Sequence, residues 1–307
     1  MARKHLILFV WLALGASALG SSPSNLIVSA SPDPSVGRSL KITITNRSSR
    51  KVTATAKVDM IGNRTDTISD VALGARETTT LTIPNAQPAT TALTIPLPVA
   101  VSVTAVGGEA EWSGNVHFWS ARRGADGPPL LLASAQLWQS QDGTWTGPND
   151  LSAKATARYD DRALYLRAEV TDDVFHQPFS LGEAWKGDGL QIAIDPNWSR
   201  RSDATESVEF GLALTPGGPQ VYRSTPLVGV MPGATLSVKR DGDCTTYDAA
   251  IPWSQLGVKA VRPPRTIGFA LLLNDNDGGS REGWLSYGDG IAAAKRADRY
   301  GTLTLLP

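Results

Sequence analysis

One short segment places an aromatic ring beside polar side chains just ahead of a strand. Trp185-Lys-Gly-Asp-Gly-Leu-Gln191 precedes a strand that ends at Asp195. The apolar C–H face of a sugar ring packs on indole, and planar polar groups nearby bond its hydroxyls. Trp185 therefore predicts a stacking platform on a loop rim, with Asp188 and Gln191 as its polar partners. The alternative is that Trp185 caps the core of the fold.

A second cluster, Asn274-Asp-Asn-Asp-Gly-Gly-Ser-Arg-Glu-Gly-Trp284, follows the apolar strand Gly268–Leu273. Its glycines permit tight turns, and its carboxylate and amide oxygens are the hard ligands that Ca²⁺ uses. A structural Ca²⁺ is therefore expected, although the spacing does not match an EF-hand loop. The candidate ligands are Asp172, Asp195 and Asp277. The alternative is a plain hairpin loop.

Three further residues are candidates for contact with a polysaccharide or glycan. They are Asp275, Arg281 and Tyr287. A guanidinium can give paired hydrogen bonds to vicinal hydroxyls, or it can pair with a neighbouring carboxylate. The sequence holds no Gly-x-Ser-x-Gly, His-Glu-x-x-His or phosphate-binding glycine loop. No catalytic pair of carboxylates is signalled either, so we expect the protein not to be an enzyme.

The distribution of aromatic residues divides the chain that must position these groups. No Phe, Tyr or Trp occurs from Ser21 to Glu111, whereas aromatics are frequent from Trp112 onward. We therefore expect two domains, residues 21–112 and 115–307. The first alternates apolar and polar residues with the period of a strand, as in 40–45, and predicts a small immunoglobulin-like sandwich.

The second domain is also rich in predicted strands. Ala163–Val170 and Gly189–Asp195 are clear examples, and Trp253–Leu256 is the only helical turn expected. Many antiparallel strands with little helix indicate a sandwich. The predicted fold is thus all-β, with two β-sandwich domains.

The N-terminus predicts export. Arg3 and Lys4 precede the apolar run Leu6–Leu14, and small residues follow, which is typical of a signal peptide over residues 1–20. A retained anchor is the alternative. The protein is therefore expected to be secreted, periplasmic or on the cell surface, with no membrane span in the mature chain.

Charge and cysteine content limit the partners. The chain has 29 basic and 29 acidic residues, so it offers no basic surplus for binding nucleic acid. Cys244 is the only cysteine, which excludes an internal disulfide. Its segment reads as a strand, and we expect it to be a small buried hydrophobe.

The second domain resembles the family-9 carbohydrate-binding modules and their DOMON-like relatives. The resemblance rests on an ordered set of segments rather than on one motif. They are Tyr159–Leu166, Val170–Asp173, Trp185–Asp195, Tyr247–Trp253, Gly268–Asp275 and Tyr300–Leu303. Together they cover roughly residues 115–307.

The resemblance implies a β-sandwich that binds the ends of sugar chains between two Trp rings and often carries Ca²⁺. Trp185 matches the first ring, and Gln191, Asp275 and Arg281 match polar sugar contacts. The second ring is expected near Ala294, where this sequence has none. Its substitutes would be Trp198, Tyr222, Trp284 or Tyr287.

Several functions compete at this level. A carbohydrate-binding protein with Trp185 in its site is the main hypothesis. The alternatives are a scaffold that has lost the sugar site, an accessory part of a glycoside-hydrolase system, and a haem-binding electron carrier.

Overall fold

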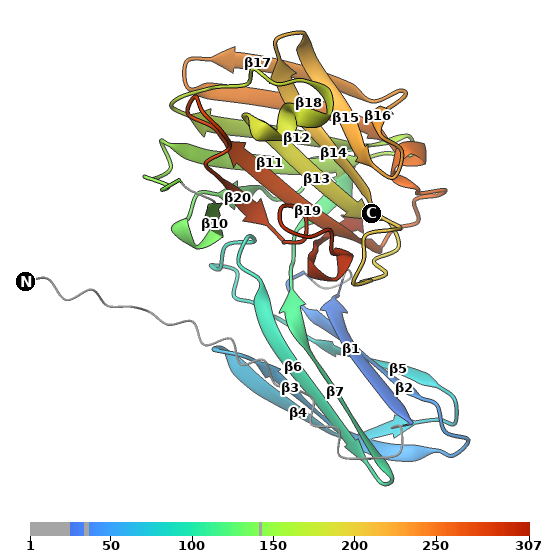
Figure 1. The fold of residues 1–307 in the computed structure, drawn as a ribbon. Helices are drawn as coiled ribbons and strands as arrows, with labels where there is room; N and C mark the ends of the chain where they lie inside the picture. Colours follow the sequence, from blue (N-terminus) through green and yellow to red (C-terminus); the bar gives the residue numbers. More distant parts are fainter. Residues whose placement is uncertain (1–24, 34–36, 141–142) are drawn as a thin grey trace, which may run out of the picture.

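A computed structural model describes residues 25–33, 37–140 and 143–307, and most of them lie in strands (Figure 1). The predicted all-β fold is confirmed. The predicted signal peptide lies outside the described residues. Two small sheets form from residues 26–116, and a large sheet forms from residues 120–306.

The two small sheets have simple antiparallel orders. One is β1 (Leu26–Pro32), β2 (Leu40–Asn46) and β5 (Thr78–Ile83), and the other is β4 (Arg64–Leu73), β3 (Val52–Met60), β6 (Leu97–Ala105) and β7 (Gly108–Val116). The expected alternation is clear in β2, where Leu40, Ile42 and Ile44 are fully buried. The strands β1, β4 and β7 were not predicted. The immunoglobulin-like character of this part stays a prediction.

The large sheet contains the remaining strands. Its main path runs β16 (Gly229–Val230), β15 (Gly218–Thr225), β14 (Val208–Thr215), β13 (Gly189–Asp195), β19 (Arg265–Asp275), β21 (Gly301–Leu306), β8 (Ser120–Arg123), β11 (Leu151–Tyr159), β12 (Ala163–Asp172), β18 (Cys244–Pro252) and β17 (Thr235–Asp241). Off this path, β20 (Gly283–Tyr287) pairs with β19, β10 (Trp138–Ser140) with β20, and β9 (Leu130–Leu132) with β11.

This sheet folds over on itself to make a sandwich. The short strand β8 pairs in parallel with both β21 and β11, and so joins the two layers. Between the layers lies a small cavity whose lining comes from both of them. The lining includes Ala155, Leu166, Ala168 and Tyr247 from one layer, and Leu190, Ile192, Leu212 and Leu271 from the other. Apolar side chains from both layers thus form one core.

The layer that contains β13 and β19 is buried on both faces. Its inner face joins the main core, whereas Ala193, Ala270 and Leu272 contact a second apolar cluster on the outer face. The other buried members of that cluster are Trp284 of β20 and, from the segment before β21, Ile291, Ala297 and Tyr300. Because both faces are covered, these strands read as nearly continuous apolar runs.

Helical structure is confined to short 3₁₀ turns in the described residues. They are η1 (Ala135–Leu137), η2 (Leu181–Lys186), η3 (Trp253–Leu256) and η4 (Ala297–Arg299). The predicted turn at Trp253 is confirmed as η3, and its indole Nε1 donates to Asp160 O at 2.8 Å. The turn η2 was not predicted. In the described part of the chain, no helix is long and apolar enough to cross a membrane.

The prediction for Cys244 is wrong, because its side chain is exposed. Cys244 is the first residue of β18 and pairs with Asp241 across the tight turn from β17. Burial in β18 begins at the next residue, Thr245. The predicted alternation of buried and exposed residues in β18 is correct, but Cys244 falls on the exposed face of the strand.

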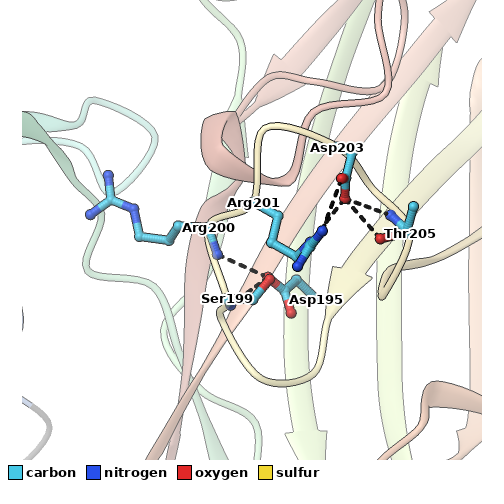
Figure 2. Close-up of polar contacts among 6 residues, drawn as sticks. All are labelled: Asp195, Ser199, Arg200, Arg201, Asp203 and Thr205. Atoms are coloured by element: carbon cyan, nitrogen blue, oxygen red, sulfur yellow. Dashed lines mark hydrogen bonds and ion pairs between the residues drawn. The ribbon is translucent and has the colours of Figure 1, made fainter.

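Asp195 ends β13 and organises the loop that follows it (Figure 2). Its Oδ1 accepts a hydrogen bond from Asn197 N, and its Oδ2 accepts from Ser199 N, Ser199 Oγ and Arg200 N. The Arg200 side chain points away from Asp195 in Figure 2, and its guanidinium lies 5.4 Å from the Trp112 ring of β7. The fully buried carboxylate of Asp195 thus shapes the contact between the two parts of the chain.

Asp195→Ala is expected to lower the free energy of unfolding by about 1–3 kcal/mol, because it removes the acceptor of four part-buried hydrogen bonds that order the loop. Urea denaturation measures this. Asp203→Ala is the control, since Asp203 pairs with Arg201 at the exposed end of the same loop, and it should change little. If Asp195→Ala lowered the free energy of unfolding only when Ca²⁺ is present, Asp195 would act as a metal ligand, which would contradict its role as an acceptor of loop hydrogen bonds.

Candidate functional site

A cleft lies between η2 and the outward face of strands β13, β14 and β15. Its walls are formed by Leu181, Gly182, Ala184 and Trp185 of η2, and by Gln220, Tyr222 and Ser224 of β15. Its remaining lining comes from residues 189–191, residues 210–213 and Asn274. Trp185 is 39% exposed, although large apolar side chains are mostly buried elsewhere. An accessible indole beside polar amides is the arrangement that the sequence predicts at this position.

The floor of the cleft is shaped by one cross-strand row. Tyr222 pairs with Gly211, and Gly211 pairs with Gln191. Paired residues on neighbouring strands share a face, so the missing side chain at Gly211 leaves a trough between Tyr222 and Gln191. A ring bound in this trough would have an aromatic group on one side and an amide on the other.

Buried glutamine contacts hold η2 over this floor. Gln177 is 7% exposed, and its Nε2 donates to Ala184 O at 2.8 Å and to Asp188 O at 2.6 Å. From the sheet side, Gln220 Oε1 accepts a hydrogen bond from Leu181 N at 3.1 Å. Leu181 has a φ of 56°, which costs a non-glycine residue about 1 kcal/mol or more. These contacts fix the position of Trp185 before any ligand arrives.

The guanidinium of Arg281 lies over the rings of both Trp185 and Trp284. Its guanidinium carbon is 4.9 Å from the centre of the Trp185 ring and 4.4 Å from the Trp284 ring. Its Nη1 donates to Asn274 Oδ1 at 3.3 Å and to Gln191 Oε1 at 3.4 Å, both long for such bonds. Arg281 therefore supports the indole and the two amides that line the cleft.

A group of carboxylates lies where β12 and β19 end. Asp172, Asp275 and Asp277 have carboxylate oxygens within 4.8 Å of one another, and Asp150, Asp173 and Asp277 form a second such group. Asp172 and Asp275 are almost fully buried. Asp275 Oδ1 is buried without a hydrogen-bond partner. An orphaned carboxylate oxygen beside two others fits a hard cation such as Ca²⁺.

The pKa values of these groups reflect their crowding. Burial first, and then the charge of Asp277, raises the pKa of Asp172 to about 6 and that of Asp275 to about 8. Burial and the charge of Asp172 raise the pKa of Asp188 to about 9. Carboxylates held this close oppose each other's ionisation unless a positive charge compensates them.

The carboxylates and the cleft are physically connected. Asp188 is 2% exposed and accepts hydrogen bonds from His176 N and Asn276 N. Asn276 in turn donates from Nδ2 to Lys186 O at 2.7 Å, at the last residue of η2. The loop after β19 is therefore bound to the turn that carries Trp185.

The structure brings together some of the predicted site residues and separates others. Trp185 and Gln191 line the cleft, and Arg281 lies behind them. Asp188 and Asp275 belong instead with the carboxylates, next to the predicted metal ligands Asp172 and Asp277.

Two predicted positions do not join either group. Tyr287 is fully buried, donates from its hydroxyl to Thr302 O at 2.7 Å, and packs edge-on against Trp119. It is a core residue, so its prediction as a sugar contact is wrong. Asp195 lies at the far end of β13 from Asp188, about 20 Å along the strand, with its oxygens occupied by loop N–H groups.

Other residues of the cleft were missed or left as alternatives. Tyr222 was named only as a substitute second ring, and Asn274, Gln220 and Gln177 had no predicted role. Alternation within β15 was the available signal, since it places Gln220 and Tyr222 on one face. Near Ala294, where a second ring was expected, Lys295 Nζ pairs with Glu209 Oε1 at 2.7 Å.

Comparison with known proteins identifies a family that matches the second part of the chain. Residues 132–306 match the model of the family described as carbohydrate family 9 binding domain-like. The comparison with curated proteins found no match.

Two similar solved structures are family 9 carbohydrate-binding modules from Caldicellulosiruptor kristjanssonii. The one in complex with cellotriose is 18% identical, with a TM-score of 0.48, over 61% of this chain and 93% of that chain. The one in complex with glucose is 19% identical, with a TM-score of 0.45, over 61% of this chain and 94% of that chain. Because the family match spans more than half of the sequence, this chain belongs to the carbohydrate family 9 binding domain-like family.

Proposed function

We propose that this protein is a secreted, non-catalytic carbohydrate-binding protein whose site is the cleft between η2 and the face of β13–β15. Family membership supports carbohydrate binding in general. The observation that carries the specific site is the exposed indole of Trp185 opposite a floor of small residues flanked by Tyr222 and Gln191. Stacking on the rings and hydrogen bonds to the amides would together hold a sugar.

Tyr222 supplies the second ring in this proposal. It lines the cleft from β15, whereas Trp185 lines it from η2, and a Cβ added at Gly182 of η2 would lie 3.5 Å from the Tyr222 ring. The segment around Ala294 contributes no aromatic group, so a sugar would be held by Trp and Tyr rather than by two Trp rings.

The proposed absence of catalysis rests on the same lining. Hydrolysis of a glycosidic bond needs two carboxylates across the cleft. The described residues that line the cleft include no Asp or Glu. Secretion is proposed from the basic residues and short apolar run of the first twenty residues.

We also propose that Asp172, Asp275 and Asp277 bind a structural Ca²⁺. The support is the proximity of their oxygens and the unpartnered, buried Oδ1 of Asp275. A cation there would compensate the crowded carboxylates and brace the loop that Asn276 ties to η2.

Trp185→Ala is expected to weaken binding of the best glycan at least about tenfold, because the stacking face is lost. A glycan array would select that glycan, and titration calorimetry would measure the dissociation constants. Trp198→Ala is the matched control, since Trp198 lies outside the cleft in the loop after β13. Equal binding by wild type and Trp185→Ala would remove Trp185 from the site.

Gly211→Val is expected to abolish glycan binding while leaving the melting temperature nearly unchanged. A Cβ at Gly211 meets only Leu190 O, at 3.6 Å, so the backbone accepts it, but the side chain fills the trough. Gly217→Val, at the turn between β14 and β15, is the control. Full binding by Gly211→Val would show that the sugar lies elsewhere.

Saturating Ca²⁺ is expected to raise the melting temperature of EDTA-treated protein by about 5–10 °C, as for a ligand at roughly 100 times its dissociation constant. Asp275→Asn should remove most of this shift. The control Asp161→Asn alters an exposed carboxylate paired with Arg123 and should keep the shift. An unchanged melting temperature of the wild type with Ca²⁺ would refute the metal site.

A further inference from the structure

Arg281 carries a buried positive charge that its surroundings do not neutralise. The residue is 6% exposed. Both of its hydrogen bonds go from Nη1 to neutral amide oxygens, and Nε has no partner. In the described part of the chain, it forms no ion pair. Buried guanidinium groups are ordinarily paired with carboxylates, so a buried arginine with only neutral acceptors is unusual.

The nearby carboxylates do not supply the missing charge. Asp275 ends β19 and Asp277 lies in the loop before Arg281, but their oxygens lie within 4.8 Å of those of Asp172. Burial lowers the pKa of Arg281, and no carboxylate opposes that shift. The rings of Trp185 and Trp284 compensate the cation only in part, since the face of an aromatic ring carries a partial negative charge and not a full one.

The unneutralised charge is directed at the cleft. The acceptors of its Nη1 are Gln191 and Asn274, and both of these side chains line the cleft beside Trp185. Their bonds to Nη1 are long, so a stronger acceptor entering the cleft could replace them. A carboxylate matches the guanidinium far better than an amide oxygen, because it adds charge and a second oxygen.

We propose that the cleft prefers an acidic sugar, a uronic acid residue whose ring stacks on Trp185 and whose carboxylate is bound by Arg281. This inference rests on the proposed function of the cleft. The carboxylate of a hexuronate projects outward from the rim of its ring. A carboxylate at this position can take the place of the Gln191 and Asn274 oxygens, which line the cleft and now accept from Nη1. A small anion would use Arg281 alone and leave the aromatic walls empty.

The test compares tri-galacturonate with its fully methyl-esterified form and with neutral cellotriose. Esterification removes the charge and keeps the sugar ring. We expect wild-type protein to bind the acid at least about tenfold more tightly than the ester, and this preference should shrink as salt rises. Titration calorimetry on the full chain measures all three affinities.

Gln191→Glu provides the internal test of Arg281. The substitution keeps the shape of the side chain and places a carboxylate where Nη1 already donates. It should bring the ratio of the affinities for the acid and the ester to about one. This ratio is the readout, because Gln191 also lines the cleft and both affinities can fall. Melting temperature and circular dichroism report intact folding. Gln136→Glu, an exposed position outside the cleft, controls for the change in net charge.

The outcomes separate the two proposals. Binding of the ester or of cellotriose as tightly as the acid overturns the acidic preference and leaves carbohydrate binding standing. A preference that survives in Gln191→Glu excludes Arg281 as its source. Failure to bind any of these ligands or any array glycan overturns the proposed function, and the acidic preference with it.

Discussion

The side-chain carboxyl group of Asp188 holds the two loops of the candidate site together, and it is almost wholly out of water. It accepts hydrogen bonds from His176 N, in the segment before η2, and from Asn276 N, in the loop after β19. Burying a polar carboxyl group is costly unless its oxygens accept hydrogen bonds. The position of Trp185 and the position of Arg281 both depend on this shared anchor, because each belongs to one of the two loops.

Charge is segregated on the two sides of these loops. The acidic groups Asp172 and Asp275 gather beneath them, whereas the cleft has neutral amides in front of the cationic Arg281. A positively charged ion on one side and a sugar carboxylate on the other would each relieve an imbalance that the protein alone leaves. The same short stretch of chain, residues 274–284, thus contains both Asp275 and Arg281, whose side chains favour ligands of opposite charge.

The fold was largely predictable, because strand periodicity, turn residues and the aromatic boundary all favour sheets. For the candidate site, the sequence could predict those residues whose type alone suggests contact with a sugar, namely Trp185, Gln191 and Arg281. The site was not predictable where burial on both faces removes the alternation signal. Every residue of β20 is buried, so the sequence could not show that Tyr287 faces the core. Asp195 and Asp172 both end strands, and only the loop geometry separates a capping carboxylate from a clustered one.

The side-chain amide of Asn276 has a thermodynamic consequence. It connects the loop next to the carboxylates with the carbonyl of Lys186, one residue from Trp185. If a cation at the carboxylates strengthens glycan binding through this contact, the glycan must strengthen cation binding by the same factor, because coupling between two sites is reciprocal. The protein would then retain its glycan best where calcium is plentiful, as outside the cell, and release it where calcium is scarce.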